Sequence, residues 1–104
     1  MADGTQKQTE AKGPLNGVRI IDLTQFVLGP YATQTLGDLG ADVIKVEEPG
    51  GDRQRKDGKP PNLKEMGPSF IALNRNKRSV TVNHSKPEGQ EILRELIRQS
   101  DVLI

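Results

Sequence analysis

The stretch GVRIIDLTQFVLGPYATQTLGDLGADVIKVE, residues 17–47, decides the fold of this chain. It opens with a β-branched, largely apolar run that predicts a buried strand over residues 18–23. Pro30 then suits the first turn of a helix, because the N–H that proline lacks would be unpaired there. Apolar residues recur at helical spacing after it, which predicts a helix over 30–39. Residues 42–47 predict a second strand, so the stretch forms one βαβ unit with a right-handed crossover.

A second unit of the same kind follows later in the chain. Residues 79–83 alternate in polarity and predict a strand. Ser85 and Glu88 match a capping box, which predicts a helix with Ser85 as its N-cap. The helix carries one apolar stripe, made of Ile92, Leu93, Leu96 and Ile97. Residues 101–104 then predict the start of another buried strand.

Between the two units, residues 49–67 are rich in glycine, proline and charge and predict a long loop, with a short helical turn over 69–73. The fold class is therefore α/β: a Rossmann-like open parallel sheet, built as βαβ, long loop, βαβ. Residues 1–13 are expected to be a flexible polar tail before a single domain portion over 14–104. Three apolar residues close the chain, so we expect a truncated N-terminal part of a larger domain.

Charge is distributed unevenly along the chain. The whole chain has a formal charge of +1, whereas residues 53–78 contain eight Lys or Arg against two acids. A concentrated basic stretch indicates a local site for a polyanion, whereas a nucleic-acid binder is more often basic throughout. The alternative is a solvated, charged loop. Nucleic-acid binding ranks last, because the chain has three aromatic residues and no recognised binding motif.

Composition excludes several other classes of site and location. The chain has no cysteine and one histidine, so it has no disulfide framework, no thiol nucleophile and almost no ligands for a transition metal. No apolar run approaches the length of about 20 residues that a membrane helix needs. We expect a cytoplasmic protein without a membrane partner, and a mitochondrial or peroxisomal location stays open.

The turn after the first strand lacks the Gly-x-Gly-x-x-Gly fingerprint, which disfavours a conventional NAD-binding domain. In an open α/β sheet, ligands bind at the carboxyl ends of the strands. We therefore expect a ligand near residues 24–29, 47–51 and 83–85. No catalytic triad is visible, and we assign neither a catalytic residue nor a metal ligand. Five carboxylates are expected mostly to cap helices or face water: Asp22, Asp38, Asp42, Glu47 and Asp52.

Several motifs together resemble the opening of the class III CoA-transferases, such as formyl-CoA transferases and crotonobetainyl-CoA:carnitine CoA-transferases. They are LNGVRIIDLT at 15–24, GPYAT at 29–33, LGDLGADVIKVE at 36–47, GGD at 50–52, NRNKRS at 74–79 and KPEG at 86–89. The resemblance runs in one register from residue 14 to residue 104. Each motif alone is weak, but the set is specific.

The resemblance implies a CoA-binding portion of a transferase that moves CoA between carboxylic acids, with acyl-CoA and an acid as substrates and no tightly bound cofactor. In the family, a downstream Asp carries the reaction and two ring-shaped chains interlink into a homodimer. These 104 residues alone are therefore expected to be inactive. An α-methylacyl-CoA racemase shares this opening and stays an alternative, as does a non-catalytic nucleotide-binding module.

The family's CoA contacts map onto Val27, Leu28, Glu48 and the run Val82, Asn83, His84 and Ser85. Backbone amides near a helix N-terminus suit an anion, and the nearby cations Arg75, Lys77 and Arg78 can supplement them. The alternative for these three cations is that they orient a loop by pairing with local carboxylates. Three positions depart from relatives: bulky Leu28 replaces a small residue, Glu48 replaces a cation in some, and Ser85 replaces a lysine in many.

Overall fold

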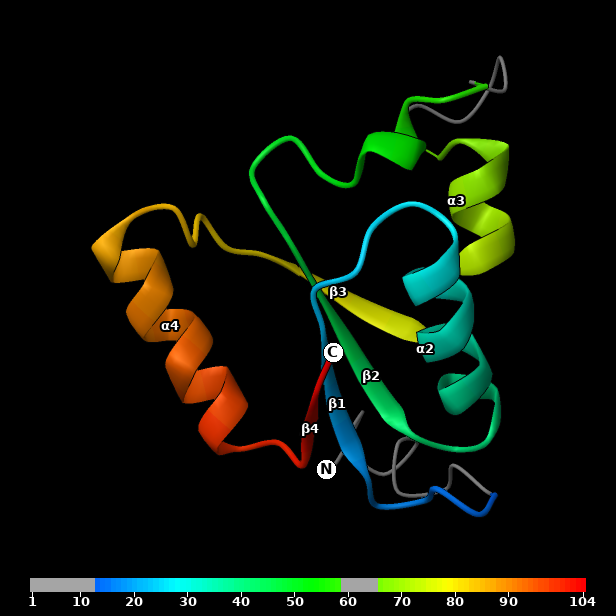
Figure 1. Ribbon diagram of the computed structural model, residues 1–104, viewed down its shortest axis with the longest axis horizontal. Helices are drawn as coiled ribbons and strands as arrows, with labels where there is room; N and C mark the ends of the chain where they lie inside the picture. Colours follow the sequence, from blue (N-terminus) through cyan, green and yellow to red (C-terminus); the bar gives the residue numbers. More distant parts are fainter. Residues whose placement is uncertain (1–12, 59–65) are drawn as a thin grey trace, which may run out of the picture.

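The computed structural model describes residues 13–58 and 66–104, and these build one open sheet of four strands with helices on both faces (Figure 1). All described strand pairs are parallel, and the strand order is β3-β2-β1-β4. The elements in chain order are β1 (Arg19–Asp22), α2 (Leu28–Asp38), β2 (Asp42–Glu47), the 3-10 turn η1 (Arg53–Arg55), α3 (Pro68–Leu73), β3 (Lys77–Thr81), α4 (Pro87–Arg98) and β4 (Val102–Leu103). The predicted α/β class with an open parallel sheet is confirmed.

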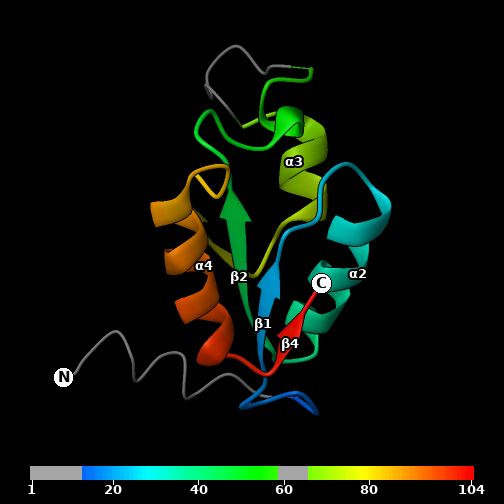
Figure 2. The ribbon, with the colours of Figure 1, turned by 60° about the vertical axis from the view of Figure 1, so that its left-hand side comes forward.

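The two long helices lie on opposite faces of the sheet, α2 with α3 on one side and α4 on the other (Figures 1 and 2). The strand order explains this arrangement. The chain moves one way across the sheet from β1 to β2, and the opposite way from β3 to β4. Two crossovers of the same hand that run in opposite directions must place their helices on opposite faces.

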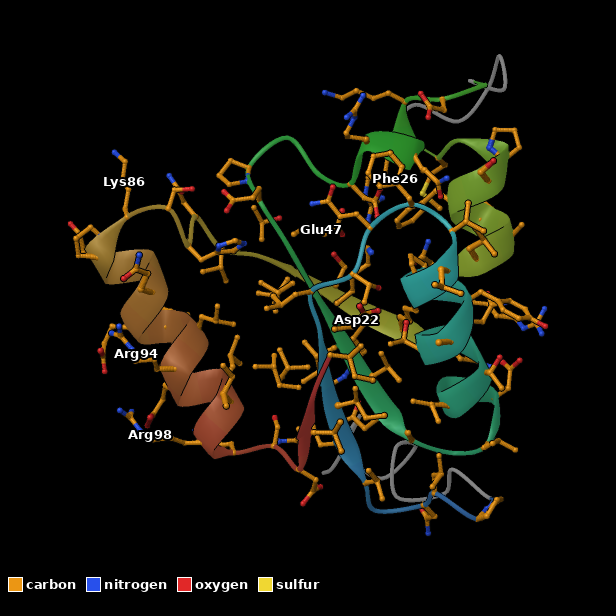
Figure 3. The ribbon with its side chains drawn as sticks, in the orientation of Figure 1. Asp22, Phe26, Glu47, Lys86, Arg94 and Arg98 are labelled. Carbon is orange, nitrogen blue, oxygen red and sulfur yellow. The ribbon has the colours of Figure 1, made fainter. Side chains whose placement is uncertain are left out.

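Strand alternation divides the apolar core between the two faces. On the α2 face, Ile20, Ala41 and Val43 are buried together. On the α4 face, Ile21 and Val46 are buried with Val82. Three residues of the predicted stripe on α4 (Leu93, Leu96 and Ile97) pack against this second cluster. The basic side chains of α4, Arg94 and Arg98, point away from the sheet (Figure 3).

The observed strands and helices lie close to the predicted residue ranges, with differences at some of their ends. The second strand has its predicted bounds, and the first strand and helix begin or end within two residues of prediction. β3 starts two residues before the predicted range 79–83, at Lys77. Within the predicted loop, Arg53–Arg55 form a 3-10 turn closed by the Asp52 carboxylate, which accepts from the Gln54 N–H. Residues 59–65, and all but the last residue of the predicted tail 1–13, lie outside the described residues.

The predicted capping box at the start of α4 is wrong. The N-cap is Lys86, which makes no side-chain capping hydrogen bond, and Pro87 occupies the first helical position. The Ser85 hydroxyl instead lies 3.5 Å from the Glu48 carboxylate at the end of β2. Proline at the first helical position moves the helix start past Ser85, because it supplies the fixed φ that a helix needs there.

One edge of the sheet is β4, which pairs with β1 through Val102 and Leu103. Both side chains are exposed, as is that of Ile104. None of the helices in the described ranges has the length and apolar character needed to cross a bilayer.

Candidate functional site

The carboxyl ends of β1, β2 and β3 meet at one edge of the sheet, which we call the carboxyl edge. It is made by residues 23–28 after β1, 48–52 after β2 and 82–86 after β3. β2 and β3 lie on one side of β1 and β4 lies on the other. The chain therefore reverses its direction of travel beside β1, and a reversal of this kind opens the ligand crevice of an open α/β sheet.

Five of the predicted site residues come together at this edge. The His84 Nε2 atom lies 2.9 Å from Glu48 Oε1, which joins the loop after β3 to the loop after β2. Val82 is buried and donates its N–H to the Glu47 carbonyl at 2.9 Å, so the segment after β3 stays paired with the end of β2. The Asn83 side chain accepts from the Ser85 N–H at 3.3 Å and shapes the turn. His84 and Glu48 keep about a third of their side chains exposed, so both are open to solvent at this edge.

Val27 and Leu28 stand at the start of α2 on the same edge. Val27 is the N-cap and Leu28 the first helical residue, and they are 56% and 84% exposed. The backbone of α2 approaches Thr24 closely because Gly29 has no side chain. A Cβ at position 29 would lie 2.4 Å from the Thr24 Cβ. The first amides of a helix have no partner within the helix and carry its positive end. This turn therefore presents donors and exposed apolar surface side by side.

The structure pairs each of the three predicted cations with a carboxylate, and two of them lie away from the carboxyl edge. Arg75 forms a bidentate ion pair with Asp38, the last residue of α2. The shorter of the two distances, from Nη2 to Oδ2, is 2.7 Å. Arg78 forms a similar pair with Asp42 at the first residue of β2. Both pairs lie at the amino end of the sheet, away from Glu48 and His84. They match the alternative left open above, in which the cations pair with local carboxylates.

Lys77 is buried between the sheet and α2. Its Nζ lies 2.9 Å from Asp22 Oδ2 and donates to Asn74 Oδ1 at 2.7 Å. Burial lowers the pKa of Lys77, and the Asp22 carboxylate offsets only part of this effect. Burial would raise the pKa of Asp22, but hydrogen bonds from Thr24, Thr33 and Lys77 outweigh it and hold that pKa below its ordinary value. The pair is almost completely shielded from solvent.

The sequence analysis did not predict a layer of buried charge that lies under the carboxyl edge. On the α2 face, Asp22 of β1 contacts Lys77 of β3, and Lys45 of β2 lies 2.9 Å from Asp52. Asp22 and Glu47 both point to this side of the sheet (Figure 3). Most of the five carboxylates were expected to cap helices or face water, and Asp52 does cap η1. All five also pair with cations: Asp22, Asp38, Asp42, Glu47 and Asp52. The signal in the sequence was charge of both signs at inward positions of neighbouring strands.

Glu47 holds the loop after β2 in place. Its carboxylate accepts from Arg55 Nε and Nη2, both at 2.7 Å, and from the Asp52 N–H at 2.8 Å. The Ser79 hydroxyl donates to it from β3, and the Arg55 guanidinium stacks on the Phe70 ring at 3.9 Å. Burial would raise the pKa of Glu47, but the bonds from Arg55, Ser79 and Asp52 lower it from 4.5 to about 2.

This pKa predicts how stability depends on pH. A carboxyl group with a lowered folded-state pKa stabilises the fold fully above its unfolded pKa, and the contribution is lost as pH falls through the folded pKa. At pH 7, Glu47→Gln should therefore be less stable than the wild type by about 3 kcal/mol. The difference should close between pH 4.5 and pH 2. Urea unfolding of both chains across this range measures it, and a difference that stays constant with pH would contradict the assignment.

Comparison with known proteins agrees with this architecture. The model of CoA-transferase family III matches residues 15–104. The succinyl-CoA:glutarate CoA-transferase of Mus musculus is 44% identical over 99 residues, which cover 95% of this chain and 23% of the relative. The formyl-CoA:oxalate CoA-transferase of Streptomyces coelicolor is 48% identical, over 86% of this chain and 22% of the relative.

Among solved structures, a CaiB/BaiF family protein from Brucella suis superposes with a TM-score of 0.80 at 42% identity, over 88% of this chain and 25% of that one. The chain thus spans about a quarter of the length of the relatives it matches. The family model covers most of the chain in one continuous match, and fold and sequence agree. The chain belongs to CoA-transferase family III.

Proposed function

We propose that the carboxyl edge binds the nucleotide part of CoA, in a protein that transfers CoA between carboxylic acids. One observation carries the proposal: in a chain of this family, Glu48, His84 and Ser85 converge from two strand ends beside the start of α2. Polar side chains, helix amides and exposed apolar surface at one sheet edge match the mixed chemistry of a nucleotide with a long organic arm.

The relatives support the chemistry in kind. Their names pair an acyl-CoA with a carboxylic acid, succinyl-CoA with glutarate in one and formyl-CoA with oxalate in another. We infer that the family's reactive Asp is not among these residues, and we expect them to bind CoA without transferring it. In this proposal, the substrates of the whole protein are an acyl-CoA and a carboxylic acid. We also propose that the whole protein forms the family's interlocked homodimer.

The proposed site contains Val27, Leu28, Glu48, Val82, Asn83, His84 and Ser85. For Arg75, Lys77 and Arg78 we propose a different role, in which they stabilise the fold by neutralising Asp38, Asp22 and Asp42. Cations held in this way have little charge left to offer a phosphate at the carboxyl edge.

A change of charge at Leu28 tests the site. The side chain is 84% exposed, so substitution leaves the core intact. Leu28→Asp should weaken CoA binding about three- to tenfold at low salt by repelling the phosphates, and Leu28→Lys should strengthen it by a similar factor. Calorimetry at low and high salt measures both, because salt should shrink both effects.

Two controls accompany this measurement. Ile92→Asp changes an exposed apolar residue of α4 to the same acid, and it should leave the affinity nearly unchanged. Arg75→Ala with Arg78→Ala should do the same, since their partners lie at the amino end of the sheet. Equal losses from Leu28→Asp and Ile92→Asp, or no CoA binding by the unaltered chain, would contradict the proposed site.

A further inference from the structure

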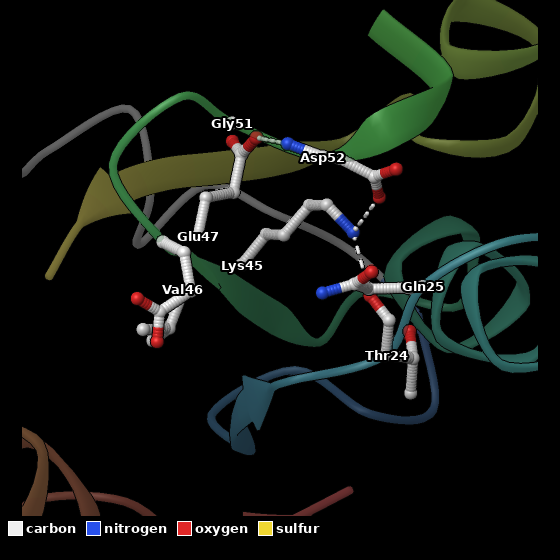
Figure 4. A pocket seen from close by; sticks show the side chains of 8 residues that line it. Thr24, Gln25, Lys45, Val46, Glu47, Gly51 and Asp52 are labelled. Carbon is white, nitrogen blue, oxygen red and sulfur yellow. Dashed lines mark hydrogen bonds and ion pairs between the residues drawn. The ribbon is translucent and has the colours of Figure 1, made fainter. Parts of the chain in front are cut away.

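Lys45 is a buried cation on β2. Its partners, Thr24 and Asp52, lie outside the strands. The side chain is 2% exposed. Its Nζ donates to the Thr24 carbonyl at 2.9 Å and lies 2.9 Å from Asp52 Oδ2 (Figure 4). Thr24 belongs to the turn after β1, and Asp52 belongs to the loop after β2. One ammonium group therefore contacts two of the three segments that form the carboxyl edge.

Each partner of Lys45 is itself fixed in its own segment. The Thr24 N–H and hydroxyl donate to Asp22 Oδ1 at 2.8 and 2.5 Å. The Asp52 N–H donates to Glu47 Oε1, and Asp52 Oδ1 accepts from the Gln54 N–H at 2.9 Å. A shift of either segment thus moves a partner of Lys45 rather than a loose side chain.

The two segments also border a common hollow. Thr24 and Gln25 line it from the turn after β1, and Gly51 and Asp52 line it from the loop after β2, with Lys45 between them (Figure 4). Glu48 also lines it. Its volume is about 10 Å³, which is roughly the space needed to hold one water molecule. A larger ligand must therefore lie over the rim, where it contacts both segments at once.

A purely structural role does not account for this choice of residue. An apolar side chain of similar volume often stabilises a buried position as well as an ion pair does, because taking two charges out of water is costly. What an apolar residue cannot do is bind a carbonyl of one segment and a carboxylate of another. Ionic or polar groups that connect two separate segments specify how the segments are arranged.

We propose that Lys45 is a positioning residue that couples the turn after β1 to the loop after β2 and so sets the shape of the carboxyl edge. A displacement of the Asp52 loop reaches Thr24 through the Lys45 ammonium. Its consequence for CoA rests on the proposed function: contacts made by one segment strengthen those made by the other.

A double-mutant comparison by NMR tests the coupling without any ligand. Asp52→Asn should shift the amide signals of Thr24 and Gln25 in a chain that has Lys45, and should leave them unshifted in the Lys45→Met background. The Arg53 guanidinium also lies over the Phe26 ring, 5.3 Å from its centroid, and gives a second path between the segments. All chains in the comparison therefore carry Arg53→Ala. Equal shifts in both backgrounds would overturn the proposal.

Calorimetry with CoA is the second readout. Lys45→Met should weaken binding about tenfold, a usual size for coupling between two sites. The matched control is Lys56→Met, the same change on an exposed lysine next to η1, which should bind within about twofold of the unaltered chain. If Lys45→Met fails to fold, Asp52→Asn takes its place and should shift Thr24 and weaken binding; an unmoved Thr24 would overturn the proposal.

The outcomes separate the two proposals. No CoA binding by the unaltered chain contradicts the proposed function, and the NMR comparison still decides the coupling. Equal CoA affinity of the unaltered chain and Lys45→Met overturns the role of Lys45 and leaves the proposed function standing.

Discussion

Asp22→Ala should destabilise the fold by about 3–5 kcal/mol, because it leaves the Lys77 ammonium buried without its counterion. Both side chains of the pair are 2% exposed or less. The same change removes the acceptor of the Thr24 N–H and of the hydroxyls of Thr24 and Thr33. A small domain is stable by about 5–15 kcal/mol in total, so the loss is a large fraction of it.

Chemical unfolding measures this loss, with Asp57→Ala as the control. Asp57 is an exposed aspartate of the loop after β2, and its removal should cost less than about 0.5 kcal/mol. The double variant Asp22→Ala with Lys77→Met removes both charges and should be more stable than Asp22→Ala alone. A double variant that is less stable than the single one would show that the buried charge is not the cause.

Among glycine-to-alanine changes at the described residues, Gly89→Ala should reduce stability the most, because its added methyl group would have the closest contact. Inside a helix, alanine is ordinarily better than glycine by about 1 kcal/mol. Here a Cβ would lie 1.7 Å from the Asn83 carbonyl oxygen and 2.4 Å from its carbon. Backbone atoms cannot rotate away as a side chain can, so α4 or the turn before it must move. We expect a loss of about 3 kcal/mol, the upper part of the range for overpacking.

The variant should also reduce CoA binding, because the displaced turn carries Asn83 and His84 of the proposed site. Gln90→Ala, at the next and exposed position of α4, is the matched control and should change stability by less than about 0.5 kcal/mol. Urea unfolding and calorimetry compare the two. A Gly89→Ala chain as stable as the unaltered one would mean that α4 packs less closely than the structure shows.

The second strand was predictable from sequence alone. β2 has its predicted bounds, because Val43, Ile44 and Val46 form a β-branched segment with turn-forming glycines on both sides. β3 was placed two residues too late because Lys77 and Arg78 resemble the end of a charged loop. They enter the strand because Asp22 and Asp42 neutralise them, from positions 55 and 36 residues away. No local pattern reports such partners.

The candidate site divides in the same way. The rule that ligands bind at the carboxyl ends of parallel strands predicted the edge at which Glu48 and His84 meet. Arg75 and Arg78 were also predicted to lie at the site, because they are basic and close in sequence to residues 82–85. In the fold they pair with Asp38 and Asp42 at the opposite end of the sheet. Sequence proximity to a site does not fix the direction in which a long side chain points.

Residues 17–47 thus determined by themselves that this protein folds as a parallel α/β sheet with a βαβ start, because hydrophobic periodicity and helix and turn signals act over short distances. Only the tertiary structure decided which charges meet. It pairs Asp22 with Lys77, and Lys45 with Asp52, beneath the carboxyl edge. The physical reason is that an ion pair depends on three-dimensional proximity and burial, both of which arise only when strands distant in sequence come together.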